Sequence, residues 1–423
     1  MDSPRRSVLM LAFQFPPYEE STGSQRILGF VRHLPALGWS PIVVTARLSA
    51  YPQINTRSSE TLPPETTVLR AFAFDVKRAL SFRGIYPRTL STPDRWNSWI
   101  VGSVATGLRA IRKNRPSAIW ATFPLPSALV AGIVLTRLTG LPLVADLRDP
   151  ILYETWPDGA WERKVYGVIE RALVRNAAAI VLTTPGARRL YQERYPQHAQ
   201  KFHTIANGMD PVDDTARTTT PEPDASQRPI TLVHSGLMEM PDRDPTAFFA
   251  ALRDLATQGD LANHRVRVVL RASGRESLYN EMLRANGVSE LVEIAPRVSR
   301  ADAVAEMHSA SALLLFQGKH CNRQIPAKAY EYLILGKPIV CLADRGGDTH
   351  ALVHDEWHVP YCADMEDPGD IARTLRAFLD DTRRGTVYAP PVALRERHTR
   401  RAQAVALGDL LESVARRAPN RTS

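Results

Sequence analysis

Lys328 and Glu331 are the residues whose types and spacing point most directly to ligand chemistry. Residues three apart on a helix share one face, and residues 328–335 have the composition of a short helix. A lysine can neutralise a phosphate, and a glutamate can accept two hydrogen bonds from the hydroxyl groups of a ribose. The alternative is an exposed ion pair of little energetic value, which the apolar neighbours of both residues disfavour.

The residues around this pair predict an α/β unit. Pro326 suits the first turn of a helix, where a missing N–H costs nothing, and Gly336 suits the position just past a helix end. Pro338 blocks any continuation of the helix, and the apolar residues 339–342 predict a buried strand. The pair is therefore expected near a helix N-terminus in an α/β unit, where such folds hold nucleotides.

The loop 14–26 joins the first predicted strand to the first predicted helix, which places it at the ligand crevice of a doubly wound domain. Gly23 allows the backbone to approach a ligand closely, and Arg26 can reach a phosphate from the first helical turn. The glycine triplet of a dinucleotide-binding fingerprint is absent. An ordinary surface loop with a solvated arginine is the alternative interpretation.

Two other predicted strand ends carry charged residues. Asp149 belongs to the segment 146–150, in which two carboxylates flank an arginine before a proline. Such a group can bind sugar hydroxyls or orient a nucleophile.

Gly236 follows the strand predicted over 230–234 and would expose backbone N–H groups to an anion. Arg243 in the loop beyond can make a bidentate phosphate contact. A structural salt bridge and a solvated loop arginine are the respective alternatives.

Strand and helix signals alternate along the whole chain. Strands are predicted at 8–13, 42–45, 68–72, 118–122, 143–147, 179–183, 203–206, 230–234, 266–271, 291–294, 312–316 and 339–342. Helices are predicted at 24–36, 94–114, 126–138, 159–176, 185–194, 245–257, 275–286, 299–307, 328–335, 368–380 and 394–416. Such alternation predicts an α/β fold with parallel, doubly wound sheets. We expect two Rossmann-like domains that face a central cleft.

The chain of 423 residues is too long for one ordinary core. Residues 210–228 are rich in Pro, Asp, Thr and Ser and have little apolar content, which is typical of a linker. The predicted organisation is an N-terminal domain over 1–209, a C-terminal domain over 229–390, and a C-terminal helix over 391–423 that crosses back to the N-terminal domain.

The formal net charge of +9 suits nucleic acid, an anionic membrane surface or phosphorylated substrates as partners. No nucleic-acid-binding motif is present, so we expect no nucleic acid as a partner. A compositional bias toward arginine is an alternative explanation of the positive charge.

Cys321, Cys341 and Cys362 fit no metal-binding spacing and predict free thiols in a reducing cytosol. The run 8–13 lacks a signal-peptide pattern, and 128–135 is too short to span a bilayer. We expect a cytoplasmic protein, with peripheral contact at the inner membrane face left open.

Taken together, these segments resemble the GT-B glycosyltransferases, in particular glycosyltransferase family 4. The N-terminal part of the resemblance is Phe15-Pro16-Pro17 with Gly23 and Arg26, then Leu37-Gly38-Trp39. The turn before the predicted linker is Ala206-Asn207-Gly208 with Asp210. The most specific part resembles the donor-binding segment of the family and consists of Pro326, Lys328, Glu331, Tyr332 and Gly336-Lys337-Pro338.

The resemblance implies a nucleotide-diphosphate sugar as co-substrate, bound mainly by the C-terminal domain, with the N-terminal domain on the acceptor side. Glu331 would hold the ribose, and Arg243 and Lys328 would neutralise the diphosphate. The implied catalytic residues are Asp149, Arg243 and Lys328; the implied donor-binding residues are Gly23, Arg26, Gly236, Arg243, Lys328 and Glu331. Such enzymes are mostly retaining and need no metal or other cofactor. The acceptor would belong to a polysaccharide, lipid-linked or secondary-metabolite pathway.

The sequence departs from the family pattern in three places. Arg323 stands where the family often has the first of two glutamates, and Leu237 stands where an arginine usually follows the phosphate-loop glycine. Arg148-Asp149 replaces a His-Asp pair. These departures keep two alternatives open: a catalytically silent GT-B module that partners another transferase, and a GT-B-like nucleotide-sugar epimerase.

Overall fold

The computed structural model describes residues 6–18, 22–54, 62–80, 91–153, 156–210, 229–261 and 265–417. The chain divides into two compact units, which we describe separately. Unit 1 consists of Met1–Gly208 and Arg400–Ser423, and unit 2 consists of Met209–Thr399. Of the predicted linker 210–228, only Asp210 lies within the described residues.

In its described residues, unit 1 has a seven-stranded parallel sheet in the order β3-β2-β1-β4-β5-β6-β7. The strands are β1 (Arg6–Leu11), β2 (Trp39–Ala46), β3 (Thr67–Ala71), β4 (Ala118–Thr122), β5 (Leu143–Arg148), β6 (Ala179–Leu182) and β7 (Phe202–Thr204). The chain runs outward in both directions from the boundary between β1 and β4, as in a doubly wound fold. The predicted strands of this half are confirmed, with small shifts at their ends.

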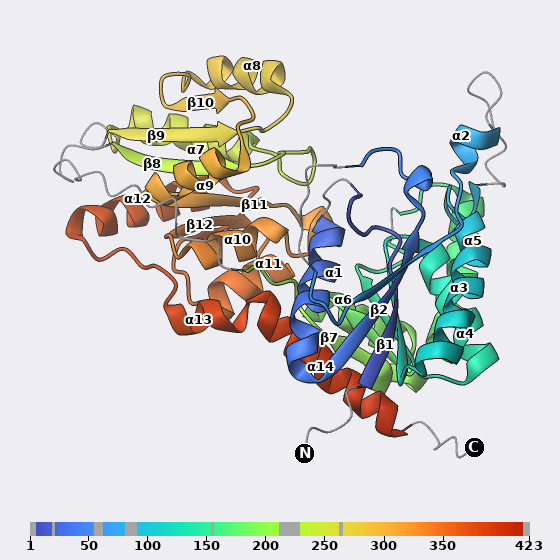
Figure 1. The fold of residues 1–423 in the computed structure, drawn as a ribbon. Helices are drawn as coiled ribbons and strands as arrows, with labels where there is room; N and C mark the ends of the chain where they lie inside the picture. The colour runs from blue at the N-terminus through green and yellow to red at the C-terminus, as the bar shows by residue number, and fades with distance from the viewer. Residues whose placement is uncertain are drawn as a thin grey trace. The chain divides into compact units, whose positions relative to one another are not determined.

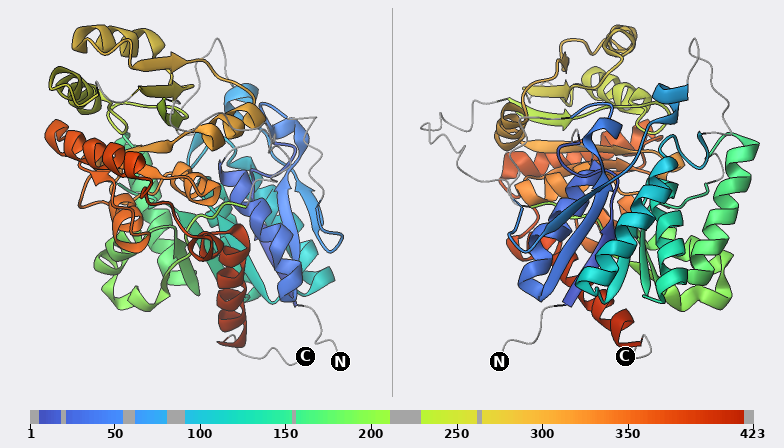
Figure 2. Two further views of the ribbon diagram at one scale, coloured as in Figure 1. Left: turned by 90° about the vertical axis from the view of Figure 1, so that its left-hand side faces the viewer. Right: turned by 45° about the vertical axis from the view of Figure 1, so that its right-hand side comes forward.

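Helices cover both faces of this sheet (Figures 1 and 2). One face packs against α1 (Thr22–His33) and α14 (Arg400–Arg417). The other packs against α3 (Ser98–Asn114), α4 (Pro126–Thr139), α5 (Ala160–Asn176) and α6 (Pro185–Arg194). Alternate side chains of a strand point to opposite faces: Leu9 and Leu11 join the core on the α3–α5 side, while Val8 and Met10 join the core on the α1 side. The continuous apolar run in β1 follows from this double burial.

The single helix predicted over 394–416 is two helices, α13 (Val392–Arg397) and α14. His398 interrupts the helical hydrogen bonding between them because its backbone leaves the helical conformation. Its buried ring accepts a hydrogen bond from Trp357 Nε1 at 3.0 Å, which fixes the break within unit 2. Residues 395–401 are all polar or charged, so no apolar pattern marks where one helix ends and the next begins.

The described part of unit 2 has a six-stranded parallel sheet in the order β10-β9-β8-β11-β12-β13. The strands are β8 (Ile230–Ser235), β9 (Val266–Arg271), β10 (Val292–Ala295), β11 (Ala312–Gln317), β12 (Ile339–Ala343) and β13 (Cys362–Ala363). The helices are α7 (Thr246–Thr257), α8 (Glu276–Asn286), α9 (Arg300–Ser309), α10 (Ala327–Leu335), α11 (Asp348–His350), the π-helical turn η8 (Ala351–Glu356) and α12 (Pro368–Arg384). The strand order again reverses, between β8 and β11. The prediction of parallel, doubly wound α/β units is therefore confirmed.

Four elements in the described part of unit 2 were not predicted: β13, α11, η8 and the 3-10 turn η7 (Lys319–Cys321). β13 contains only two residues, too few to show a hydrophobic pattern. Cys362 in β13 lies opposite Cys341 in β12. All three cysteines lie in described ranges and are free thiols, as predicted.

Candidate functional site

The end of β8 and the first turn of α10 meet at the point where the strand order of unit 2 reverses. Gly236 has φ = +136°, and a Cβ atom at this position would lie 3.1 Å from Cε of Lys328. Tyr332, one turn further along α10, accepts a hydrogen bond from the backbone N–H of Ser235 at 3.1 Å. Burial raises the pKa of Tyr332 well above its usual range, so its hydroxyl stays neutral. Position 236 thus requires glycine for two reasons: the backbone has a positive φ, and Lys328 occupies the space that a side chain would need.

Lys328 and Glu331 form the predicted pair on one face of α10. Nζ of Lys328 lies 2.7 Å from Oε2 of Glu331. The Glu331 side chain is only 7% exposed, whereas that of Lys328 is 33% exposed. The simple surface ion pair is therefore excluded, because its carboxylate is buried. A lysine ammonium group has three donors, so Lys328 keeps donors for a second anion while it neutralises Glu331.

The turn after β8 presents fewer backbone N–H groups than expected. The N–H of Gly236 donates to the carbonyl of Arg271 at 2.9 Å, and the N–H of Met238 donates to Ser273 at 2.9 Å. Only Leu237, between them, has an N–H without a hydrogen bond to any other described residue. Gly236 does not offer its own N–H to an anion, because parallel pairing with β9 already uses that group; of the backbone N–H groups expected at this turn, that of Leu237 remains.

Arg243 lies near the same end of β8. Its Nη1 donates to the carbonyl of Leu237 at 3.4 Å, which is a long hydrogen bond. Burial lowers the pKa of His234 to about 4, with a smaller contribution from the positive charges of Lys328 and Arg243. His234 is thus neutral at physiological pH and bonds through Nδ1 to the carbonyl of Leu314 at 2.9 Å. The structure therefore gathers Gly236, Arg243, Lys328 and Glu331 around one strand end of unit 2.

Arg26 in unit 1 is buried and forms a network within that unit. Its Nε and Nη2 donate to the two carboxylate oxygens of Asp146 at 3.1 and 3.0 Å. Its Nη1 and Nη2 donate to the carbonyls of Ala206 and Ile205 at 2.7 and 3.0 Å. Asp146 also accepts a hydrogen bond from Thr122 at 3.2 Å. All these hydrogen bonds occupy the guanidinium of Arg26. The structure therefore supports neither interpretation from the sequence, a phosphate contact or a solvated surface arginine.

Gly23 lies inside α1 and not in the loop before it. The helix begins at Thr22, and the preceding residues 19–21 are outside the described part of the chain. The predicted start of the helix at residue 24 was therefore late. The structure does not bring Gly23 into a loop.

Arg148 and Asp149 follow the end of β5 in a strained backbone. Arg148 has φ = +63°, and the register of β5 with β6 shifts beside it. Such a conformation costs about 1–3 kcal/mol in a residue other than glycine and is concentrated at functional sites. Nε of Arg148 is buried and has no hydrogen-bond partner among the described residues. The sequence analysis selected Asp149 but not Arg148, because no sequence signal reports a positive φ at a non-glycine residue.

Burial raises the pKa of Asp149, against the opposing effect of the Arg148 and Arg26 charges. Burial likewise lowers the pKa of Arg148. No salt bridge among the described residues joins these two side chains. The ion pair at this strand end is instead that of Asp146 with Arg26. Asp149 thus remains available for a ligand.

A buried carboxylate that the sequence analysis missed supports the segment after Asp149. Glu170 in α5 accepts hydrogen bonds from Tyr191 (2.6 Å), Tyr195 (2.7 Å) and Arg194 (2.9 Å). The Tyr191 hydroxyl in turn accepts the N–H of Ile151 at 3.0 Å. This network fixes the backbone two residues beyond Asp149. A single sequence cannot reveal it, because its members are far apart along the chain.

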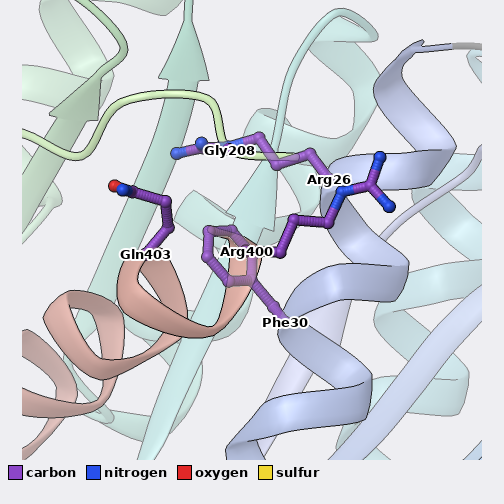
Figure 3. A pocket seen from close by; sticks show the side chains of 5 residues that line it. All are labelled: Arg26, Phe30, Gly208, Arg400 and Gln403. Atoms are coloured by element: carbon purple, nitrogen blue, oxygen red, sulfur yellow. The ribbon is translucent and has the colours of Figure 1, made fainter. Parts of the chain in front are cut away.

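A small pocket of unit 1 lies between α1 and α14 (Figure 3). Its lining residues are Arg26, Phe30, Gly208, Arg400 and Gln403. The Arg26 guanidinium lies 4.9 Å from the centre of the Phe30 ring. The cavity volume of the pocket is about 10 Å³, far less than the roughly 300–1,000 Å³ usual for small-molecule sites. It is therefore too small for a nucleotide sugar.

Replacement of Arg26 tests its structural assignment. Arg26→Ala would leave Asp146, which is fully buried, as an uncompensated charge. We expect the free energy of unfolding to fall by about 3–5 kcal/mol, measured by urea denaturation of the full chain. Arg32→Ala on the same helix is the control. Unchanged stability together with weaker nucleotide binding would instead support the phosphate contact.

The Asp149→Asn variant tests the buried carboxylate after β5. Because the pKa of Asp149 is raised in the folded state, its stabilising contribution is present at acid pH and is lost as the pH rises through the folded value. The asparagine variant should therefore match the parent in thermal midpoint near pH 3 and equal or exceed it near pH 7. The assignment would be contradicted if the variant matched the parent at pH 3 but unfolded at a lower temperature than the parent at pH 7.

Comparison with known proteins identifies the fold. Residues 21–208 match the family model described as a glycosyl transferase 4-like domain. A search of curated protein sequences found no match. Among solved structures, the chain is similar to sucrose-phosphate synthase from Thermosynechococcus elongatus, with 14% identity and a TM-score of 0.65 over 97% of this chain and 99% of that one.

Two other solved structures are similar over nearly their full length. A glycosyltransferase from Rickettsia africae has 10% identity and a TM-score of 0.68, over 97% of this chain and 99% of that one. The Anabaena protein HepE in complex with UDP-glucose has 13% identity and a TM-score of 0.56, over 98% of both chains. These likenesses show the fold of the chain, and residues 21–208 match the glycosyl transferase 4-like domain.

Proposed function

We propose that this protein transfers a sugar from a nucleotide-diphosphate sugar to an acceptor, with the diphosphate held between the end of β8 and the start of α10. The observation that carries the proposal is the approach of Lys328 to Gly236 beside the buried carboxylate of Glu331. Three groups then lie at one strand end of a doubly wound sheet: the Lys328 ammonium, the free N–H of Leu237, and the buried Glu331 carboxylate, which can accept hydrogen bonds from hydroxyl groups. Ligands of such sheets bind at this position.

Sugar transfer from a nucleotide diphosphate requires positive charge near the leaving diphosphate more than it requires a general base. When the sugar–phosphate bond breaks, negative charge develops on the leaving diphosphate and positive charge on the sugar ring. Lys328 and Arg243 stabilise the first of these charges electrostatically, and Glu331 accepts hydrogen bonds from the ribose hydroxyls. In this proposal the chain's own cations take the place of a metal ion. Retention of configuration belongs to the same proposal.

Arg148 and Asp149 in unit 1 are proposed to serve the acceptor side. The strained backbone of Arg148 and its unpartnered buried Nε are typical of a ligand contact. Asp149 offers a carboxylate to an acceptor hydroxyl. Arg26 is left out of this role because its donors are committed to Asp146 and to backbone carbonyls.

The departures from the family pattern change how the donor would be held. Leu237 is 58% exposed where the family has an arginine, so it offers an apolar surface in place of a charge. Arg323 is exposed where the family often has a glutamate. Arg243 and Lys328 would therefore carry the phosphate contacts between them. A silent module and an epimerase remain the competing functions.

One assay separates the three functions. The protein is incubated with labelled UDP-, GDP- and dTDP-sugars, UDP-glucose first because the similar HepE structure contains it. Nucleotide release that depends on an acceptor supports transfer. Release without an acceptor supports the epimerase, and binding without turnover supports the silent module.

We also propose that unit 1 contacts an anionic membrane, which would bring it to a lipid-linked acceptor. None of the helices in the described ranges is long and apolar enough to cross a bilayer. The helices α3, α4 and α5 cover one side of the unit 1 sheet (Figures 1 and 2). Their outer face combines exposed apolar and basic side chains. We call it the α3–α5 face.

The composition of the α3–α5 face suits a lipid surface. Its exposed apolar residues, including one just before α5, are Val101, Leu138, Trp156, Trp161 and Val168. Its exposed basic residues are Arg109, Arg112, Lys113, Arg137, Lys164, Arg171 and Arg175. Neither α3 nor α4 contains an acidic residue, and the acids of α5 are Glu162 and the buried Glu170. Tryptophan and basic side chains together favour the interface of anionic bilayers.

Variants at Glu331 and Arg243 test the donor site. Glu331→Gln keeps the shape of the side chain but removes its charge, so we expect the dissociation constant for the UDP-sugar to rise at least about tenfold. Arg243→Ala should lower turnover at least about tenfold, on the order of 1.4 kcal/mol. Calorimetry and product assays measure these effects, and Glu281→Gln in α8 is the control. Unchanged binding and turnover in both variants would exclude this site.

A vesicle-binding experiment tests the α3–α5 face. The double variant Lys164→Glu/Arg171→Glu should lose binding to vesicles that contain phosphatidylglycerol, because each reversal replaces attraction by repulsion. Its charge-matched control is Arg284→Glu/Arg297→Glu in unit 2. Binding of the parent should also weaken as salt is added. Equal loss in both variants would mean that net charge alone, and not this face, drives binding.

A further inference from the structure

A cluster of metal-binding side chains lies in unit 2, apart from the residues assigned to the donor. His350, His354 and Asp355 each offer a ligand atom, and these atoms all lie within 4.8 Å of one another. They belong to α11 and the π-helical turn η8, which follow β12. The two imidazole rings are stacked, with centroids 5.0 Å apart and an interplanar angle of 27°. The two histidines are four residues apart on continuous helical backbone, so they share a face.

We propose that His350, His354 and Asp355 bind a divalent transition-metal ion of the zinc class. Two imidazole nitrogens and one carboxylate oxygen form a ligand set that Zn²⁺ accepts. Magnesium and calcium prefer sites made of oxygen atoms alone, so they fit this set poorly. Three protein ligands leave a fourth, tetrahedral position for water or another ligand.

The bonding of the two histidines supports the proposal independently of their distance. His350 is only 7% exposed, and its buried Nε2 has no hydrogen-bond partner among the described residues. Buried polar nitrogens without a partner are rare, because they lose hydration without compensation. His354 differs, since its Nδ1 lies 2.8 Å from Oδ1 of Asp355. This contact places the imidazole and the carboxylate side by side, as two ligands of one ion must be.

The helical backbone at this place is unusual as well. The turn η8 has π-helical hydrogen bonding, which occurs mostly as single turns and frequently at functional sites. Its start is anchored: the N–H of Asp348 donates to Asn322 at 2.7 Å, and Oγ1 of Thr349 donates to Gln324 at 2.9 Å. The cluster is therefore held on backbone that is fixed before any ion binds. Such preorganisation favours metal binding.

Zinc binding by the full chain tests the proposal without any need for transferase activity. The protein is stripped with a chelator, dialysed, and titrated with ZnCl₂ against a chromophoric zinc indicator. We expect the parent to bind one Zn²⁺ more than the His354→Ala variant, or to bind it at least about tenfold more tightly. His354 and Asp355 are exposed, so replacing them should leave the fold intact, as circular dichroism can check. Asp355→Asn keeps the shape of the side chain and should weaken binding in the same direction.

His308→Ala is the matched control, since His308 is an exposed histidine on helix α9 of the same unit. It should bind zinc as the parent does. Cobalt provides a second measurement: Co²⁺ bound at the cluster should give a visible absorption band that His354→Ala loses and His308→Ala keeps. Equal zinc binding by the parent and His354→Ala would overturn the proposal. Equal losses in His354→Ala and His308→Ala would also overturn it, because they would indicate non-specific binding to surface histidines.

Discussion

The close contact between Gly236 and Lys328 is the constraint on which the candidate donor site depends. A side chain on residue 236 would meet Cε of Lys328 at 3.1 Å, and the backbone there has a positive φ. Because glycine satisfies both conditions, α10 can bring its first turn over the end of β8. Tyr332 secures the same approach through its hydrogen bond to Ser235. The position of Glu331 then follows, since Lys328 and Glu331 share one helical face.

Unit 1 uses the same topology in a different way. Its first helix also carries an arginine near the end of a central strand, but Arg26 is bonded to Asp146 and to the carbonyls of Ala206 and Ile205. This network joins α1, β5 and the segment after β7. A buried charge pair of this kind is costly to break, because each partner would remain buried alone. The arginine therefore stabilises the unit, and the proposed acceptor contacts fall to Arg148 and Asp149.

The sequence predicted the architecture well because parallel strands with both faces buried are continuous apolar runs, as in β1 and β11. It also predicted the shared face of Lys328 and Glu331, which depends only on helical spacing. It failed where a partner distant in sequence decides the outcome. Arg26 has the same local sequence whether or not Asp146 lies beside it, and the Gly236 N–H is available only until β9 pairs with β8. The break at His398 likewise depends on Trp357, 41 residues earlier.

The charges at the strand ends indicate which unit is better suited to a diphosphate. In unit 2, Lys328 and Arg243 lie near the end of β8, and their charges add to the larger effect of burial in lowering the pKa of His234. The one buried carboxylate there, Glu331, is already neutralised by Lys328. In unit 1, the end of β5 has Asp149, whose pKa burial raises. An added diphosphate would repel that carboxylate, whereas a neutral hydroxyl group would not, so a sugar acceptor suits unit 1 better than a second anion does.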